Sequence, residues 1–229
     1  MNVVIVIPAR YASSRYPGKP LVPLKGADGE KTLIQRTWEQ GRAVAGVARV
    51  IVATDDARIA SAVKGFGGDV VMTDEACANG TERCADALKR LGERPDLVVN
   101  LQGDALLTPP WFLEDLIAAM QARPEMGVAT PVLRCDAATY RHFREDRAAG
   151  RVGGTTAVFA ADGRALYFSK EVIPFLPDAD VSDPPVFHHV GVYAYSPDAL
   201  DRYLGWTAGP LEANEGLEQL RFLENGEPV

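Results

Sequence analysis

Apolar runs and helix-like patterns alternate along the first half of the chain. Four runs rich in valine, isoleucine and leucine have the length of buried strands: residues 2–9 (NVVIVIPA), 47–56 (VARVIVATDD), 69–73 (DVVMT) and 96–105 (DLVVNLQGDA). Residues 32–46, 57–68 and 80–92, which separate them, place apolar side chains at helical spacing. This order with short connections predicts an α/β fold, a Rossmann-like and mostly parallel sheet with helices on both faces.

After about Gly127 the pattern changes to short strands joined by longer loops. Residues 126–135, 150–170 and 187–196 have the β-branched and aromatic content of strands, so we expect a smaller mixed sheet that flanks the first. In the last run, FHHVGVYAYS, alternation along one strand would put His189, Gly191 and Tyr193 on the same side.

One more amphipathic pattern lies close to the end of the sequence. LEANEGLEQLRFLENG (211–226) predicts a single helix with Leu217, Leu220 and Leu223 facing inward. On that pattern alone, Glu218 and Gln219 would be surface residues.

The composition is that of an ordinary globular protein with an acidic balance. The chain has 229 residues, of which 47% are apolar and 24% charged, and a formal net charge of −7. Duplex binding needs many cations that neutralise phosphates, so we expect no nucleic-acid partner. Positive charge for a phosphate ligand must then be local.

Neither the cysteines nor the N-terminus indicates export. Cys77, Cys84 and Cys135 form no CxxC pair and no metal-ligand spacing, so we interpret them as small buried thiols in a reducing compartment. Met1 and Asn2 lead directly into an apolar run without the basic start of a signal peptide, and no apolar stretch has the length of a membrane span. We therefore expect a cytoplasmic protein without membrane insertion.

Local positive charge is found directly after the first expected strand. PARYASSRYPGK carries Arg10, Arg15 and Lys19, and the serines and Gly18 between them offer hydroxyl and backbone N–H donors. Cations, several donors and an approachable backbone are what a triphosphate needs. The segment lacks GxxxxGK[ST], so it is not a Walker loop. A solvated basic loop is the alternative interpretation.

Polar clusters follow other elements in the same way. Asp104 in QGDA comes after a buried strand and could hold Mg²⁺ against phosphate oxygens, although an aspartate there is more often a turn or a helix cap. In NGTERC we expect Thr81 to cap a helix, whereas Arg83 in the first turn opposes the helix dipole and suggests a ligand. A strand histidine such as His189 is usually structural.

These segments together resemble one family of enzymes. VVIPARYASSRYPGKPLVPLKG, VVNLQGD, ALYFSK, HHVGVYAY and LEANEGLEQLRFLENG occur in the order found in bacterial 3-deoxy-manno-octulosonate (Kdo) cytidylyltransferases, the CMP-Kdo synthetases. The resemblance implies that CTP and Kdo react to CMP-Kdo and pyrophosphate for lipopolysaccharide synthesis. It further implies a nucleotide-diphospho-sugar transferase type of fold, Mg²⁺ as cofactor and a homodimer.

The resemblance also assigns roles to residues. Residues 1–126 would form the nucleotide-binding half of a single domain, and residues 127–229 the sugar-acid-binding and dimerisation half. The catalytic residues would be Arg15, Lys19 and Asp104, with Asp104 as metal ligand. Arg10 and Ser13 would join Arg15 and Lys19 at the triphosphate. The other substrate-binding residues would be Pro8, Ala9, Gly80, Thr81 and Arg83 at the cytidine, Gln102 at the sugar or nucleotide, and Lys170, His189, Tyr193, Glu218 and Gln219 at the sugar acid.

The chain departs from the family pattern at three places. Ala105 and Leu106 replace an acidic residue and a proline, and Lys170 replaces an arginine, so a point charge replaces a bidentate fork. Family members also continue beyond ENGEPV to an aspartate that binds metal. Three hypotheses remain open: a Kdo cytidylyltransferase, a cytidylyltransferase for another octulosonate or nonulosonate, and a CTP- and sugar-acid-binding paralog with weak catalysis. A sugar-phosphate nucleotidyltransferase is disfavoured, because a phosphate-sugar site would want more cations.

Overall fold

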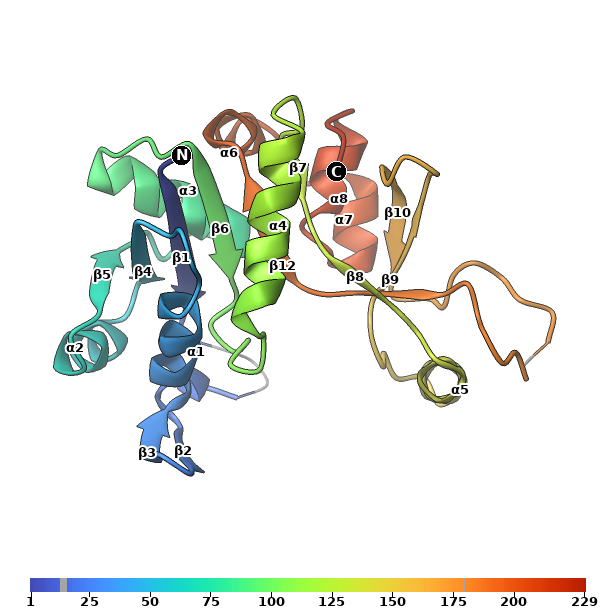
Figure 1. Ribbon diagram of the computed structural model, residues 1–229, viewed down its shortest axis with the longest axis horizontal. Helices are drawn as coiled ribbons and strands as arrows, with labels where there is room; N and C mark the ends of the chain where they lie inside the picture. Colours follow the sequence, from blue (N-terminus) through green and yellow to red (C-terminus); the bar gives the residue numbers. More distant parts are fainter. Residues whose placement is uncertain (13–15, 179) are drawn as a thin grey trace. The chain divides into compact units, whose positions relative to one another are not determined.

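A computed structural model describes residues 1–12, 16–178 and 180–229 of the chain (Figure 1). The described chain divides into two compact units. The first unit comprises Met1–Ala129 and Val192–Leu204, and the second comprises Thr130–Gly191 and Gly205–Val229. Within the described residues, no helix combines the length and the apolar character needed to cross a membrane.

The first unit is built on a six-stranded sheet in the order β5-β4-β1-β6-β12-β7. Its strands are β1 (Val3–Ala9), β4 (Arg49–Thr54), β5 (Asp69–Met72), β6 (Leu97–Leu101), β7 (Val128–Ala129) and β12 (Val192–Tyr195). β5, β4, β1 and β6 pair in parallel, and β12 pairs antiparallel with both β6 and β7. This confirms the mostly parallel sheet, whose central strands β1 and β6 are buried along their whole length.

Helices pack against both faces of this sheet. The unit contains η1 (Lys19–Leu21), α1 (Leu33–Arg42), α2 (Ala57–Gly65), α3 (Gly80–Leu91), α4 (Pro110–Ala122), α6 (Pro197–Leu204) and a hairpin of β2 (Pro23–Gly26) and β3 (Gly29–Thr32). Gly41 of α1 lies against Leu101, and Gly80 of α3 lies against Asn100. Because neighbouring strand residues point to opposite sides, α1 and α3 cover opposite faces.

The expected cap of the third helix was wrong by two residues. Asn79, and not Thr81, caps α3: its side chain accepts a hydrogen bond of 2.8 Å from the Glu82 N–H. Glu82 in turn accepts from the backbone of Ala78 at 2.7 Å, so the two side chains satisfy donors on both sides of the helix start. Thr81 lies inside the helix and is fully buried, and its hydroxyl forms a hydrogen bond of 2.8 Å with the Tyr195 hydroxyl.

The second unit has a four-stranded sheet in the order β10-β9-β11-β8, with every neighbouring pair antiparallel. Its strands are β8 (Val132–Arg134), β9 (Thr156–Phe159), β10 (Ala165–Ser169) and β11 (Phe187–His189), and its helices are α5 (Ala137–Ala148), α7 (Pro210–Glu215) and α8 (Leu220–Glu224). Tyr140 and Phe143 of α5 pack with Cys135 and Val186 in a small core.

The prediction of one strand over residues 187–196 was wrong. β11 belongs to the four-stranded sheet and β12 to the six-stranded sheet, and the chain leaves regular pairing at Val190 and Gly191. His189 therefore belongs to the second unit and Tyr193 to the first. Alternation could not reveal this, because both pieces keep the same polar and apolar rhythm while their hydrogen-bond partners change.

The prediction of one helix over residues 211–226 was also wrong. Gly216 ends α7 in the left-handed conformation with φ of 60°, and α8 begins only at Leu220. Leu220 is fully buried as expected, but Leu217 and Leu223 are only half-buried. Arg221 and Glu212 are buried instead and form a bidentate ion pair with distances of 2.6 and 2.8 Å.

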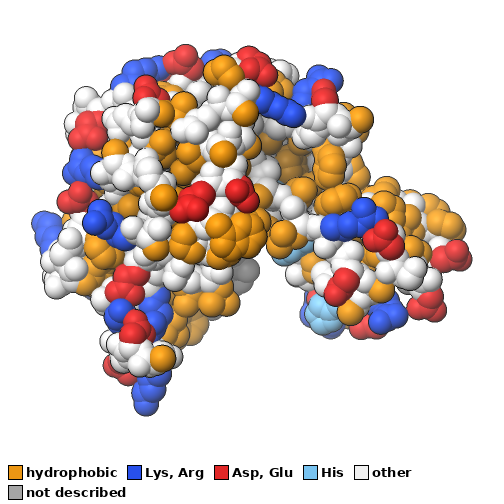
Figure 2. Space-filling model, in the orientation of Figure 1, with side chains coloured by type: hydrophobic (Ala, Val, Ile, Leu, Met, Phe, Trp, Pro, Cys, Tyr) orange, Lys and Arg blue, Asp and Glu red, His pale blue; other side chains and the backbone are white. Residues whose placement is uncertain are grey.

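Two of the three cysteines are buried, as expected. Cys84 and Cys135 lie in the interior, and Cys77 is half-buried. At the surface, the face drawn in Figure 2 shows basic and acidic side chains interspersed.

Candidate active site

The carboxyl ends of β1 and β6 lie side by side at the centre of the first unit. A side chain at Gly103, after β6, would place its first carbon 2.8 Å from the Pro8 carbonyl oxygen, so only glycine allows the two backbones to approach this closely. Thr37 of α1 donates to the Gly103 carbonyl at 3.1 Å and fixes the turn from the other side. The QGD turn is therefore held directly beside Pro8 and Ala9.

The start of α3 meets the same edge of the sheet. A first side-chain carbon on Gly80 would lie 2.9 Å from Gln102 Nε2, 3.2 Å from Asn100 Nδ2 and 3.4 Å from Pro8 Cγ. Pro8, Gly80 and Gln102, three predicted cytidine or sugar residues, therefore converge. A helix N-terminus and strand ends together offer backbone donors to an anionic ligand.

A lysine and a carboxylate form an ion pair at this edge. Lys19 Nζ donates to Asp104 Oδ2 at 2.5 Å, and the two side chains are 45% and 51% exposed. The family resemblance assigned Lys19 to the triphosphate and Asp104 to the metal, and the structure brings the two residues into contact across 85 residues of chain. An exposed pair of this kind stabilises the fold by about 1 kcal/mol or less, so the contact contributes little to stability.

The loop that carries Lys19 is braced by an aromatic residue that sequence analysis missed. The Arg58 guanidinium lies 3.3 Å from the centre of the Tyr11 ring. Gly18, in the left-handed conformation with φ of 73°, donates its N–H to the Tyr11 carbonyl at 2.9 Å, immediately before η1 begins at Lys19. The hydrogen bond between Gly18 and Tyr11 thus fixes the backbone at the point where the loop ends and Lys19 begins η1.

Other predicted residues of this loop are placed only in part. Arg10 directly follows β1 and is exposed. Ser13 and Arg15 lie outside the described residues, so their predicted roles at the triphosphate stay predictions.

Arg83 and Thr81 are both engaged inside the first unit. Arg83 is 3% exposed and donates to Asp55 at 2.9 Å and to Thr73 at 2.6 Å. The guanidinium of Arg83, in the first turn of α3, is therefore paired inside the unit with the carboxylate of Asp55, which follows β4. The predicted contribution of Thr81 and Arg83 to a cytidine pocket stays a prediction.

Tyr193 belongs to the first unit and lies beside Asn100, its neighbour across the β12–β6 pairing. Its ring stacks on that of Tyr195 with centroids 5.7 Å apart. Asn100 was not predicted. It is fully buried, and within the described part of the chain its Nδ2 has no hydrogen-bond partner.

In the second unit, Lys170 follows directly on β10. The Lys170 N–H donates to Glu215 Oε2 at 2.8 Å, and the neighbouring Ser169 hydroxyl donates to Glu215 Oε1 at 2.7 Å. Glu218 and Gln219 follow in the turn between α7 and α8; Glu218 is half-buried and Gln219 is 1% exposed. The surface position expected for Gln219 from helical periodicity alone was therefore wrong, because the helix breaks at Gly216.

His189 is enclosed in the same unit. It is 6% exposed, its Nε2 is 2.9 Å from the Thr130 hydroxyl, and its ring meets Phe168 edge-on at 4.9 Å. Burial, with a smaller contribution from His188, lowers the pKa of His189 from 6.5 to about 4. His189 is therefore neutral at pH 7, and it can meet a ligand as a hydrogen-bonding group but not as a cation.

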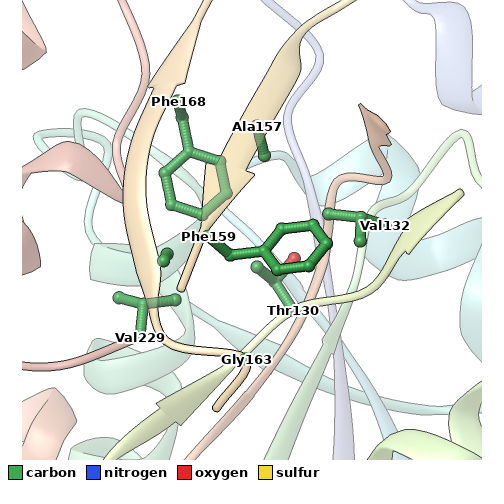
Figure 3. A pocket seen from close by; sticks show the side chains of 8 residues that line it. Thr130, Val132, Ala157, Phe159, Gly163, Phe168 and Val229 are labelled. Carbon is green, nitrogen blue, oxygen red and sulfur yellow. The ribbon is translucent and has the colours of Figure 1, made fainter. Parts of the chain in front are cut away.

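The second unit also contains an apolar pocket of about 170 Å³ (Figure 3). Its lining residues are Thr130, Val132, Ala157, Phe159, Gly163, Ala165, Phe168 and Val229. Thr130 and Phe168 contact both the pocket and His189. A lining of this kind suits apolar groups, so we do not assign the pocket to a charged sugar acid.

The fold and the strand-end cluster define a class of protein. A mostly parallel sheet brings a lysine from the first loop against a carboxylate after β6, beside a glycine-started helix, at the strand ends where open α/β sheets bind their ligands. The family model described as "Cytidylyltransferase" matches residues 4–229. The chain belongs to this family, and it is a CTP-dependent nucleotidyltransferase.

Named relatives agree with this assignment. The chain is 47% identical to the 3-deoxy-manno-octulosonate cytidylyltransferase of Maricaulis maris, over 100% of this chain and 86% of the relative. It is 43% identical to the 8-amino-3,8-dideoxy-manno-octulosonate cytidylyltransferase of Shewanella sediminis, over 99% and 87%. Its structure is similar to that of a CMP:2-keto-3-deoxy-manno-octonic acid synthetase complexed with CTP, with a TM-score of 0.86, 38% identity, and coverage of 100% and 88%.

Proposed function

We propose that this protein transfers the cytidylyl group of CTP to Kdo and releases pyrophosphate. The anomeric oxygen of the sugar acid forms a bond to the α-phosphorus, and the bond from that phosphorus to the oxygen it shares with the β-phosphate breaks. That oxygen leaves as part of pyrophosphate, and the proton of the anomeric hydroxyl passes to solvent. CMP-Kdo is the activated sugar that lipopolysaccharide synthesis consumes. The observation that carries the proposal is the contact of Lys19 with Asp104 at the strand ends where Pro8, Gly80 and Gln102 converge.

The residues of the first unit would act mainly by position and charge. Negative charge spreads over the phosphate oxygens in the transition state, so a fixed ammonium such as Lys19 lowers the barrier without leaving its place. The glycines at positions 80 and 103 leave the backbone open to the nucleotide. Arg10, Ser13 and Arg15 would add donors around the triphosphate.

Asp104 fits a Mg²⁺ that is shared with the substrate. Mg²⁺ prefers oxygen ligands and accepts one or two carboxylates, with phosphate oxygens and water completing its shell. Asp104 presents a half-exposed carboxylate at the strand end, and no cluster of three or more His, Cys, Asp or Glu side chains occurs among the described residues. Bound there, the ion would neutralise charge on the triphosphate. Lys19, which contacts Asp104, would share this task.

The sugar acid would be met by Lys170, His189, Tyr193, Glu218 and Gln219. Lys170 supplies the point charge for its carboxylate, and neutral His189 and the amide of Gln219 supply hydrogen bonds to hydroxyls. A second candidate substrate is 8-amino-3,8-dideoxy-manno-octulosonate, favoured by the 43% identity to enzymes named for it. That acid carries an ammonium where Kdo carries a hydroxyl.

We also infer a homodimer in the cytoplasm. CTP and the sugar acid are metabolites of that compartment, and an enzyme that consumes both is expected beside them. The homodimer rests on resemblance to the family alone. Light scattering of the purified protein tests the dimer, and a single-subunit mass would reject it.

Pyrophosphate release tests the function. The purified protein is incubated with CTP, Mg²⁺ and either Kdo or its 8-amino analogue, and parallel reactions replace CTP by UTP or the acid by sialic acid. We expect release with CTP and Kdo, with a higher kcat/KM than for the amino analogue. A higher value for the analogue makes that compound the substrate. Binding of CTP without release of pyrophosphate in the presence of any of these acids would instead support a binding paralog.

A further inference from the structure

Glu215, the last residue of α7, carries a carboxylate that receives two short hydrogen bonds, besides a longer one of 3.4 Å from the Tyr167 hydroxyl to Oε1. Oε1 accepts from the Ser169 hydroxyl at 2.7 Å, and Oε2 accepts from the Lys170 N–H at 2.8 Å. The Ser169 oxygen in turn accepts from the Glu171 N–H at 2.9 Å. Glu215 therefore ties three successive residues at the end of β10 to the end of α7.

The head of Lys170 is placed by the residue after Glu215. A first side-chain carbon on Gly216 would lie 3.0 Å from Lys170 Nζ, so the ammonium lies directly over this glycine. Gly216 also has a φ of 60°, which other residues rarely adopt. The α7 end thus sets both the backbone of Lys170, through Glu215, and the space for its ammonium, through Gly216.

We propose that Glu215 is a positioning residue that fixes Lys170 for the carboxylate of the sugar acid. This inference rests on the proposed function and adds a residue that neither motif nor resemblance assigned. A lysine is a mobile point charge on a four-carbon stem, unlike the planar fork of arginine, so an external anchor matters more to it. The two donors meet different oxygens of Glu215, and only a carboxylate accepts at both positions, since glutamine has an acceptor oxygen at one and an NH₂ donor at the other.

A matched control is offered by Glu224 of α8, which binds the other end of α7. Glu224 accepts from the Leu211 and Glu212 N–H groups at 2.8 and 3.0 Å, so it too is a carboxylate that receives two donors. Both of these hydrogen bonds anchor the start of α7. If Glu215 served stability alone, Glu215→Gln and Glu224→Gln would behave alike.

The experiment compares both variants with the wild type in the pyrophosphate assay, together with the melting temperature. We expect Glu215→Gln to raise the KM for Kdo about ten-fold, with the KM for CTP unchanged. Glu224→Gln is expected to leave both KM values unchanged at a similar loss of melting temperature. In a Lys170→Met background, adding Glu215→Gln should raise the KM for Kdo no further, because the ammonium that Glu215 positions is already absent.

The outcomes separate this inference from the proposed function. Absence of release by the wild type with either octulosonate overturns both. Release by the wild type with an unchanged KM for the acid in Glu215→Gln, or with equal effects of Glu215→Gln and Glu224→Gln, overturns the inference alone. If Glu215→Gln does not fold, Ser169→Ala replaces it; a rise in the KM for Kdo supports the inference, and unchanged constants overturn it.

Discussion

Protonation of His189 should make the fold sensitive to acid between pH 7 and pH 5. Its pKa is about 4 in the folded protein against 6.5 in the unfolded chain, because burial disfavours the charged ring. Within this range the unfolded chain binds a proton that the folded protein does not. The free energy of unfolding therefore falls as the pH falls, and the effect is complete only below the folded pKa.

The magnitude follows from the two pKa values. A full proton of difference changes the free energy of unfolding by about 1.4 kcal/mol per pH unit. At pH 7 the unfolded histidine is mostly neutral, and at pH 5 it is almost fully charged, so the loss between these values is about 2 kcal/mol. At pH 7 the contribution is close to zero.

Urea denaturation at both pH values measures this loss, with His189→Gln as control. Glutamine keeps an N–H that can reach the Thr130 hydroxyl, as His189 Nε2 does at 2.9 Å, but it does not titrate. The variant should lose about 2 kcal/mol less than the wild type between pH 7 and pH 5. Equal losses would refute the assignment of a buried, neutral His189. The other titrating groups are present in both proteins and cancel in the difference, apart from the smaller coupling between His188 and His189.

Three further predictions concern turnover and stability. Lys19→Ala and Asp104→Ala should each lower kcat at least about 100-fold and change the melting temperature little. The control Lys25→Ala, at an exposed lysine of β2, should change neither quantity. Wild-type rates in the first two variants would show that the pair is not catalytic. Gly80→Ala should raise the KM for CTP several-fold, because its methyl group would meet Gln102 at 2.9 Å, and an unchanged KM would place the nucleotide elsewhere. Glu212→Gln should cost about 3 kcal/mol in denaturation, since it leaves the Arg221 charge buried and half-paired, and a loss below about 1 kcal/mol would contradict that account.

Much of the site in the first unit could be predicted from local sequence. The loop after β1, the QGD turn and the start of α3 each follow a buried strand or begin a helix, and parallel strands carry such segments to one edge. That geometry brings Pro8, Gly80 and Gln102 together and lets Lys19 reach Asp104.

Partners that lie far away in the sequence could not be predicted. The hydrophobic pattern does not predict that Arg58 lies over the Tyr11 ring or that Arg83 pairs with Asp55. It also does not predict that Glu215 accepts a hydrogen bond from the Lys170 N–H. Each of these contacts depends on which elements become neighbours, and hydrophobic spacing carries no information on the identity of a polar partner.

The sequence by itself determined the alternation of strands and helices, the parallel sheet, and the family, because periodicity and motif order are local properties of the chain. Only the tertiary structure decided that residues 187–196 divide between two sheets, that Gly216 breaks the last helix, and that Gln219 is buried. Backbone hydrogen bonds must be satisfied somewhere, and which sheet edge or helix end satisfies them is settled by packing between distant segments.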